Sequence, residues 1–295
     1  MSRKKMLKVI GLSRSRFYDW WRRKGIENRH NGKIPKQHWL LEEERKAILE
    51  YCRMQEEKGY RRLTYEMIDN DIVAVSPATT YRILRENGLL QRWGKKNTTS
   101  KGDGFDQPTG PNEQWHVDIS YIKVLRHFYF LITVLDGFSR RVMHHELREQ
   151  MEEWDVQITV QRALEKNPDA QGVVISDNGP QFISKDFHEF IRDNELSHVT
   201  TSVYYPQSNG KLERFHGTIK QEEIRVNSYL DIDDARERVE RYIRHYNEQR
   251  LHSSIYYLTP QEVFEGKMEV RLADRQRKLD EARRRREEMA ARRAA

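Results

Sequence analysis

Three acidic residues stand in sequence contexts that suit ligands of a metal ion. Asp118 lies in the segment WHVDIS, Asp177 lies in ISDNGPQF, and Glu213 lies in NGKLERFH, with 35 residues between the second and the third acid. Carboxylate oxygens are hard ligands that select Mg²⁺ or Mn²⁺ over softer metals. Three acids sharing two such ions could catalyse an in-line displacement at phosphorus. One ion would activate the attacking oxygen, and the other would stabilise the leaving 3′ oxygen.

Each acid taken alone also has an ordinary structural explanation. An aspartate at the end of a strand commonly caps a turn, and a glutamate on a helix is commonly a surface charge. Two observations favour chemistry. An unpaired carboxylate on the polar face of a central strand, as expected for Asp118, is costly to bury without a cation or a hydrogen-bond donor. On the predicted helix of Glu213, His216, Gly217 and Lys220 share one face with the acid, an unusual set for core packing.

The composition is that of a polar globular protein with core-forming side chains. The 295 residues are 34% charged and 37% hydrophobic and include 6 Trp, 14 Tyr and 10 Phe, which excludes a disordered chain. No run approaches the roughly 18 apolar residues of a membrane span, and the basic N-terminus lacks the apolar stretch of a secretory signal. The single cysteine, Cys52, excludes an internal disulfide and any zinc site with two thiolates. It predicts a reducing, cytoplasmic location.

The net charge of +7 is unevenly distributed along the chain. Residues 1–30 carry a net +8 and residues 267–295 a net +5, which leaves an acidic centre. Basic ends suit a polyanion such as DNA, and an acidic centre suits metal cations. For the 267–295 tail, solvated charge that serves solubility is an equal alternative. We expect this tail to be helical and exposed.

Two helix-turn-helix units are predicted ahead of the acids. In residues 1–30, Gly11 separates two helical stretches, and Ser13 is placed to cap the second. Phe17, Trp20 and Trp21 give this second helix one apolar face. The basic residues left for DNA are Arg14, Arg16, Arg22 and Arg23. The alternative is a helical hairpin that packs against the rest of the protein.

The second unit is predicted within residues 38–93. Its last helix begins at Ser76-Pro77, a strong start signal, and ends before Gly88. Tyr81 and Leu84 are expected to face inward. The residues expected to reach a DNA groove are Thr79, Thr80, Arg82 and Arg85.

After an expected linker at residues 94–112, rich in Gly, Pro, Ser and Thr, the pattern changes to alternating strands and helices. Strands are predicted at residues 115–125, 128–135, 141–147, 173–175 and 196–200, and helices at 152–166, 182–194 and 208–223. The order βββαβαβα predicts an α/β core over residues 113–225, with a mixed five-stranded sheet and helices on its faces. A helical extension is expected over residues 226–266.

These motifs together resemble those of a known family. Asp118, Asp177 and Glu213 resemble the D,D-35-E triad of DDE transposases and retroviral integrases. The segment YYPQSNGKLERFH at 204–216 is similar to the third-motif region of insertion-sequence transposases with an integrase core. Residues 245–264 resemble the segment that closes that domain, and GLSRSRFY at the N-terminus resembles the start of OrfB-type bacterial proteins.

The resemblance implies an RNase H-like catalytic core and an enzyme of the bacterial cytoplasm, associated with the nucleoid when bound to DNA. Such an enzyme cleaves the ends of an insertion sequence and joins them to target DNA. Asp118, Asp177 and Glu213 would then hold two Mg²⁺ or Mn²⁺ ions. The implied partners are double-stranded DNA, as terminal inverted repeats and as target, further copies of this chain in a dimer or larger oligomer, and a protein from an upstream reading frame. The side chains implied at the DNA are Gln207, Asn209, Lys211, Arg214, His216 and Lys220.

Two other hypotheses stay open at this point. A nuclease with the same core would cut without joining, although tandem helix-turn-helix units argue against it. A repressor derived from a transposase would keep the core only as a scaffold, although three intact acids argue against that. Retroviral integrases carry an N-terminal His₂Cys₂ zinc module, which one cysteine cannot supply, so the bacterial branch fits better.

Overall fold

The computed structural model describes residues 6–7, 10–22, 24–25, 40–55, 58–90, 107–201 and 210–294. Three predicted DNA contacts, Arg23, Gln207 and Asn209, lie outside the described residues, as does the expected linker before residue 107. All three acids lie within the described residues.

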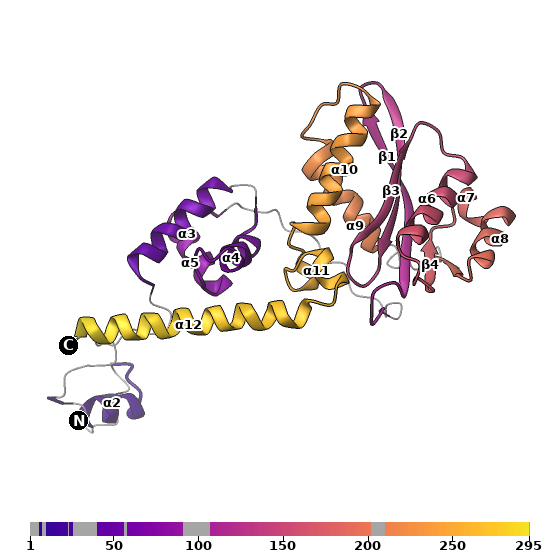
Figure 1. The fold of residues 1–295 in the computed structure, drawn as a ribbon. Helices are drawn as coiled ribbons and strands as arrows, with labels where there is room; N and C mark the ends of the chain where they lie inside the picture. Colours follow the sequence, from indigo (N-terminus) through magenta and orange to yellow (C-terminus); the bar gives the residue numbers. More distant parts are fainter. Residues whose placement is uncertain are drawn as a thin grey trace.

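A mixed five-stranded sheet positions the acids (Figure 1). Its strands are β1 (Gln114–Val124), β2 (His127–Asp136), β3 (Val142–Arg148), β4 (Val173–Ser176) and β5 (Ser197–Thr200). Across the sheet the order is β3-β2-β1-β4-β5. The first three strands are antiparallel neighbours because short turns join them, whereas β4 and β5 run parallel to β1 after helical crossovers. The predicted α/β core of RNase H-like type is confirmed.

Helices cover both faces of the sheet, and the alternation along β1 decides which layer each side chain meets. One layer contains α6 (Glu153–Lys166), α7 (Pro180–Ile183) and α8 (Lys185–Asp193), and the other contains α9 (Gly210–Ile219) and α10 (Ile232–Glu248). Trp115 and Val117 pack in the first layer, and Ile122 and Val124 pack in the second. Asp118 lies an even number of residues from Ile122 and Val124, so its side chain points to the same side of the sheet, the side covered by α9.

A smaller helical unit precedes the sheet. It consists of α3 (Glu42–Met54), α4 (Tyr60–Asp69) and α5 (Pro77–Glu86), which enclose a core of their own. The predicted start of α5 is confirmed, because the Thr79 N–H donates to the Ser76 hydroxyl at 3.3 Å. Gly88 follows its end with a φ of +69°. Leu84 is buried as predicted, but Tyr81 is partly exposed.

The N-terminal helix α2 (Arg14–Arg22) is capped as expected, since the Arg16 N–H donates to the Ser13 hydroxyl at 3.3 Å. None of its residues is buried, and Trp20 and Trp21 remain largely exposed. Its predicted apolar face therefore packs on no core within the described part of the chain.

Two predicted helices differ in detail from the structure. The helix expected at 182–194 is divided at Ser184, whose hydroxyl accepts the Phe187 N–H at 3.2 Å and so starts α8 separately. The helix expected at 208–223 is α9 followed by a π-helix, η3 (Lys220–Ile224). The short helices η4 (Ser253–Ile255) and α11 (Pro260–Phe264) were not predicted as separate elements.

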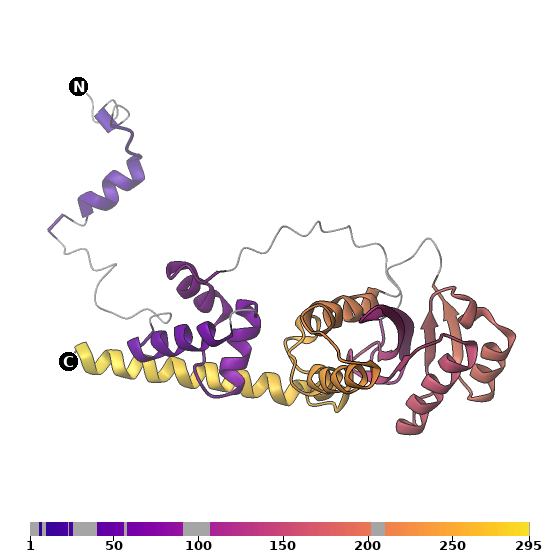
Figure 2. The ribbon, with the colours of Figure 1, turned by 90° about the horizontal axis from the view of Figure 1, so that it is seen from above.

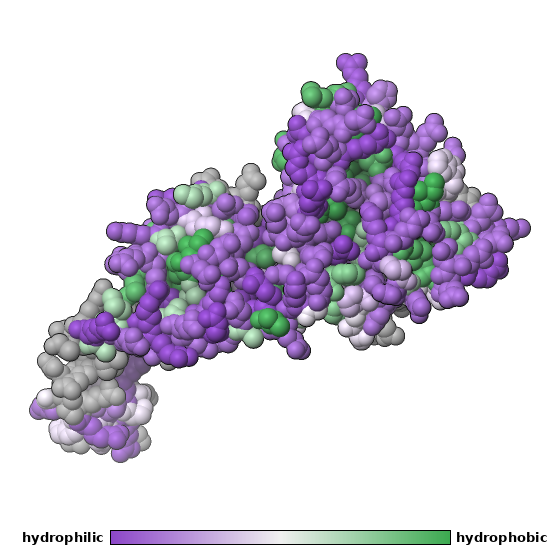
Figure 3. All heavy atoms as spheres, viewed as in Figure 1, coloured by the Kyte–Doolittle hydropathy of each residue, from purple (hydrophilic) through white to green (hydrophobic). Residues whose placement is uncertain are grey.

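The C-terminal helix α12 (Met268–Ala294) corrects one expectation. The tail is helical, as predicted, but it is not simply exposed: it runs beside the α3–α5 unit (Figure 2), and Arg275 retains only 3% of its accessible surface. Hydrophilic residues cover most of the face that Figure 3 shows. Within the described residues, no helix combines the length and the apolar character needed to cross a bilayer.

Candidate active site

Asp118 lies near the middle of β1, on the face covered by α9. Its side chain is partly buried, and Oδ1 accepts the Ile119 N–H at 2.8 Å. Oδ2 lies 3.5 Å from Nδ1 of His216, which comes from α9. One carboxylate oxygen is thus anchored by the backbone, and the other faces the helix that carries Glu213.

Asp177 follows the last residue of β4, the strand that pairs in parallel with β1. The last pair of this register is His116 with Ile175, and each aspartate lies two residues beyond it. Oδ1 of Asp177 accepts the Gly179 N–H at 2.9 Å, and the side chain is exposed. The two aspartates therefore come from adjacent parallel strands.

Glu213 lies in the first turn of α9, and its side chain is exposed. The helix is held against the sheet by its buried residues Leu212, Phe215, His216 and Ile219. Phe215 is buried and meets the ring of Tyr246 edge-to-face at 4.9 Å between centroids. His216, three residues after Glu213, is also buried, with Nε2 3.4 Å from the Thr133 hydroxyl. Packing on β1 and β2 thus sets the position of the helix that carries the third acid.

The donor set fits a hard divalent cation. Among the described residues, no lysine or arginine forms an ion pair with Asp118, Asp177 or Glu213, although arginine–carboxylate pairs are common elsewhere in the chain. Three carboxylates without a lysine or arginine ion pair suit Mg²⁺ better than a structural salt-bridge network. The described residues nevertheless contain no group of three or more His, Cys, Asp or Glu side chains close enough together to hold a metal ion. The two aspartates come from adjacent strands, but the structure does not gather all three acids.

Basic side chains gather beside the start of α9. Burial, with the nearby charge of Arg140, lowers the pKa of Lys211 to about 8. Burial also lowers the pKa of His116 to about 3, helped by Lys211 and Arg140. Neither ring nitrogen of His116 has a hydrogen-bond partner in the described structure. Sequence reasoning missed His116 and Arg140, because one lies in a strand and the other in a turn about 70 residues before Lys211, and only the fold brings them together.

The turn after β2 holds Arg140 in place. Asp136 is fully buried, and its Oδ2 accepts the Ser139 N–H at 2.7 Å and the Ser139 hydroxyl at 2.6 Å. Arg140 then adopts a φ of +68° and donates to the Gly137 carbonyl at 2.8 Å. This bonding turns the guanidinium of Arg140 toward the region of Lys211, where two cations together suit an anionic ligand.

Lys220 begins the π-helix that continues α9. Burial lowers its pKa, as does Arg225, while Asp118 acts in the opposite direction. Lys220 and Asp118 are therefore close enough to interact electrostatically. A π-helix is rare and often occurs at functional sites.

Three predicted DNA contacts are corrected by burial. Thr79 and Thr80 lie inside the α3–α5 unit, where the Thr64 hydroxyl donates to that of Thr80 at 2.8 Å. His216 is buried between α9 and the sheet and is not free to meet DNA. Each follows from helix geometry, since residues three or four apart share a face. Thr79 and Thr80 share the buried face of Ile83 and Leu84, and His216 shares that of Leu212 and Ile219. The predicted contacts that remain exposed are Arg14, Arg16, Arg22, Arg82, Arg85 and Arg214.

Two surface clefts in the described residues lie away from the acids. One of about 520 Å³ is lined largely by α10, including Arg238, Arg241 and His245. The other, of about 180 Å³, is lined by Arg140 and Tyr256 among others. Neither is lined by Asp118, Asp177 or Glu213.

Comparison with known families adds independent information. Two models described as integrase core domain match this chain, one over residues 108–206 and the other over residues 194–260. Together they span the sheet, all three acids and the α10 segment.

Named relatives come from bacterial insertion elements. An uncharacterized 31 kDa protein of insertion element IS600 from Shigella sonnei is 24% identical, over 86% of this chain and 96% of that protein. The transposase InsF for insertion sequence IS3A of Escherichia coli is 25% identical, over 90% of this chain and 94% of that protein. Among solved structures, the HTLV-2 integrase catalytic core domain in complex with magnesium is 22% identical with a TM-score of 0.43. The match covers 53% of this chain and 98% of the integrase domain.

Proposed function

Because this chain belongs to the integrase-core family of insertion-sequence transposases, we propose that it binds the terminal inverted repeats of its element and catalyses 3′-end cleavage and strand transfer. The observation that supports the proposal is that Asp118 on β1 and Asp177 directly after β4 come from adjacent parallel strands, with Asp118 facing the helix that carries Glu213. Among the described residues neither aspartate has a lysine or arginine partner, which leaves its carboxylate available to a divalent cation.

The chemistry consists of two displacements at phosphorus. In the first, water attacks the phosphodiester at the end of the element, the bond from phosphorus to the 3′ oxygen breaks, and the 3′-OH takes up a proton. In the second, this 3′ oxygen attacks a target phosphodiester and displaces the target's 3′ oxygen. Asp118, Asp177 and Glu213 would hold two Mg²⁺ or Mn²⁺ ions, which when bound would neutralise phosphate charge and polarise the attacking oxygen.

The remaining side chains bind and orient DNA. Lys211 at the start of α9, Arg140 in the turn after β2, and Arg214 and Lys220 further along α9 and η3 would contact phosphates around the scissile bond. Arg82 and Arg85 on α5, and Arg14, Arg16 and Arg22 on α2, would contact the repeats. Arg23, Gln207 and Asn209 belong to the same proposal.

The active assembly would contain at least two copies of this chain, because an element has two ends that must be held together for joining. A protein encoded in an upstream reading frame is a further expected partner. Both would be tested by sizing the complex on end DNA with and without that protein.

The test is a strand-transfer assay with end DNA labelled at its 5′ terminus, in Mg²⁺ and in Mn²⁺. We expect cleaved ends and joined product from the unmodified chain, and neither from Asp177→Asn. Asp169→Asn is the matched control, because Asp169 is an exposed acid just ahead of β4 rather than after it. We expect this control to act normally.

Two results would overturn the proposal. Cleaved ends without joined product under any condition would favour the nuclease. Unaltered DNA-dependent activity in Asp177→Asn, with repeat binding intact, would leave only the DNA-binding hypothesis.

A further inference from the structure

The C-terminal helix α12 packs along the α3–α5 unit instead of leaving its arginines free for DNA. We propose that α12 is an intramolecular brace that holds the α3–α5 unit at a set distance and orientation from the catalytic core, with Arg275 as its central positioning residue. The brace consists of α12 and the contacts made by Arg271, Arg275, Lys278, Arg285 and Arg286. It goes beyond the proposed activity, since it concerns how two parts of the chain are joined.

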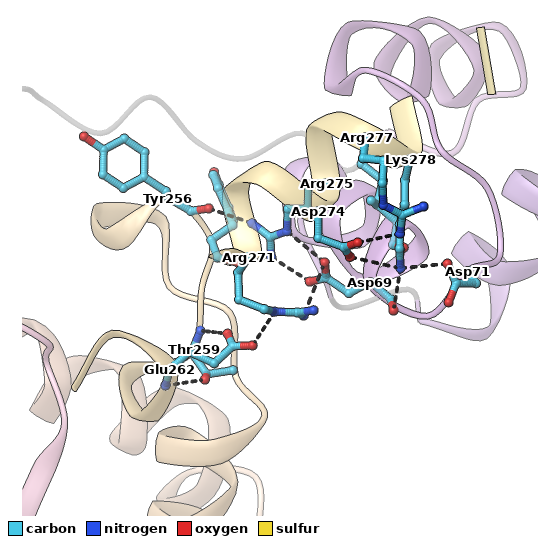
Figure 4. Close-up of polar contacts among 12 residues, drawn as sticks. Asp69, Asp71, Tyr256, Thr259, Glu262, Arg271, Asp274, Arg275, Arg277 and Lys278 are labelled. Carbon is cyan, nitrogen blue, oxygen red and sulfur yellow. Dashed lines mark hydrogen bonds and ion pairs between the residues drawn. The ribbon is translucent and has the colours of Figure 1, made fainter. Parts of the chain in front are cut away.

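Arg275 joins α12 to α4, 206 residues earlier in the sequence, and to the segment at 256–257 (Figure 4). Its guanidinium donates to both carboxylate oxygens of Asp69 on α4, at 2.8 and 2.6 Å. It also donates to the carbonyls of Tyr256 and Tyr257, at 2.9 and 2.6 Å. A buried arginine that is bidentate to a carboxylate and also donates to two carbonyls is a specific and demanding arrangement.

The backbone at 256–257 has an unusual conformation at the point where it meets Arg275. Tyr256 and Tyr257 both have a φ of +57°, a left-handed conformation that is rare and strained for tyrosine. The Tyr257 ring stacks on Tyr65 of α4 at 4.9 Å between centroids, and Arg275 lies 4.8 Å from the centre of the Tyr65 ring. Two consecutive strained residues persist only where the surroundings stabilise them, and here both carbonyls accept hydrogen bonds from Arg275.

The residues on either side of Arg275 also attach α12 to α4. Arg271 pairs with Glu262 of α11 at 2.7 Å and with Asp69 at 3.5 Å, so it too joins the core to α4. Lys278 donates to the Ile68 carbonyl at 3.1 Å and pairs with Asp71 at 2.7 Å. A cation over the last carbonyls of α4 is stabilised by the helix dipole. Figure 4 shows these side chains converging from α12 onto the end of α4.

A second set of contacts with the α3–α5 unit lies further along α12. Arg286 donates to both carboxylate oxygens of Glu44 on α3, at 2.8 and 3.1 Å, and to the Ala74 carbonyl at 2.7 Å. Arg285 adds a bond to Glu44 at 2.8 Å. Arg275 and Arg286 are separated by about 16 Å along an ideal helix. Because the α3–α5 unit contacts α12 at two separated points, it can neither slide along the helix nor rotate freely about a single contact.

A direct contact with the catalytic layer completes the link. Arg62 of α4 lies 3.9 Å from the carboxylate of Glu222, in the π-helix that continues α9. Glu222 is itself held by Arg250 through two hydrogen bonds, at 2.8 and 2.6 Å. The α3–α5 unit thus rests on the same continuous helix that carries Glu213. No contact of the brace uses Arg82 or Arg85, so α5 keeps its exposed arginines for a ligand.

The experiment measures a distance and needs no DNA. Spin labels are placed at Lys46→Cys on α3 and Lys185→Cys on α8, both exposed positions, in a full-length Cys52→Ala background. Pulsed electron resonance then reports the spread of label separations. We expect one narrow distribution in the parent chain, and a distribution broadened over most of the population in Arg275→Ala. Arg277→Ala is the matched control and should stay narrow, because among the described residues Arg277 pairs only with Asp274 and Glu281 on its own helix.

A broad distance distribution in the parent chain would overturn the proposal of a brace. So would an Arg275→Ala distribution as narrow as that of Arg277→Ala. If Arg275→Ala fails to fold by circular dichroism, Arg286→Ala decides in its place, with broadening expected. The same distance in a mixture of singly labelled chains would place α12 on a second copy and would also overturn it. Because none of these readouts uses catalysis, failure of the brace and failure of the proposed activity are separable.

Discussion

Nδ1 of His216 lies 3.5 Å from Oδ2 of Asp118, and this contact joins the helix of Glu213 to the central strand. The other ring nitrogen lies 3.4 Å from the Thr133 hydroxyl on β2. Asp118 and Thr133 are direct cross-strand partners. One imidazole therefore ties α9 to two strands at the level of the first acid, so His216 is a positioning residue for the triad.

Substituting His216→Ala should lower end cleavage by about 10- to 100-fold, the usual cost of losing a residue that orients a metal ligand. His216→Gln should recover part of the loss, since an amide can still donate to Asp118. Thr218→Ala on the same helix is the control, because Thr218 bonds only to the Arg214 carbonyl. The measurement is the rate of end cleavage as a function of Mg²⁺ concentration. Equal rates for His216→Ala and Thr218→Ala would contradict the positioning role.

Lys211 should contribute to DNA binding through phosphate charge rather than base identity. Lys211→Met is expected to weaken binding to every sequence by a similar factor and to reduce the slope of log affinity against log salt by about 1. Lys185→Met, at an exposed position on α8, should leave the slope unaltered. Fluorescence anisotropy at several salt concentrations supplies both slopes. A loss confined to the repeat sequence, with an unchanged slope, would exclude a phosphate contact.

The sheet and the acids could be predicted because their signals are local. Alternation over 115–124 identifies a strand and the face of Asp118, and Ser76-Pro77 starts a helix through its own hydroxyl and ring. The parallel pairing of the strand before Asp177 with β1 could be predicted as well, because the short apolar run at 173–175 is typical of a buried parallel strand.

Contacts between distant segments could not be predicted in this way. A row of arginines in residues 267–295 has the same pattern whether it meets solvent, DNA or another helix. Only the folded chain places Asp69 and Glu44, more than 200 residues away, against Arg275 and Arg286. The burial of Thr80 was missed for a related reason. A threonine looks polar in sequence, but in the α3–α5 unit its hydroxyl is satisfied by Thr64 and its methyl group packs inside.

Thr80 and Arg85 should behave oppositely when substituted. Thr80→Ala removes a buried hydrogen bond and should lower the stability of the α3–α5 unit by about 1 kcal/mol, with repeat recognition retained in the folded fraction. Arg85→Ala should change stability by less than about 0.5 kcal/mol while weakening repeat binding.

Cys52 provides the stability readout for this pair. It lies in the core of the α3–α5 unit, and burial raises the pKa of its thiol to about 11, so alkylation at neutral pH reports opening of the unit. Faster alkylation in Arg85→Ala than in Thr80→Ala would reverse the assignment of the two residues.

The contacts between α12 and Glu44 should be lost at low pH. Burial alone raises the pKa of Glu44, but bonds from Arg286, the Leu41 N–H and Arg285 outweigh it, so the pKa lies below its ordinary 4.5. A carboxyl whose pKa is depressed by folding contributes stability that is fully present above the unfolded pKa. That stability is lost as the pH falls from about 4.5 through the folded value. Urea midpoints measured between pH 7 and about 3.5 should therefore fall more steeply in the unmodified chain than in Glu44→Gln. The variant should begin less stable at pH 7, and parallel pH profiles for the two chains would show that Glu44 carries none of the acid sensitivity.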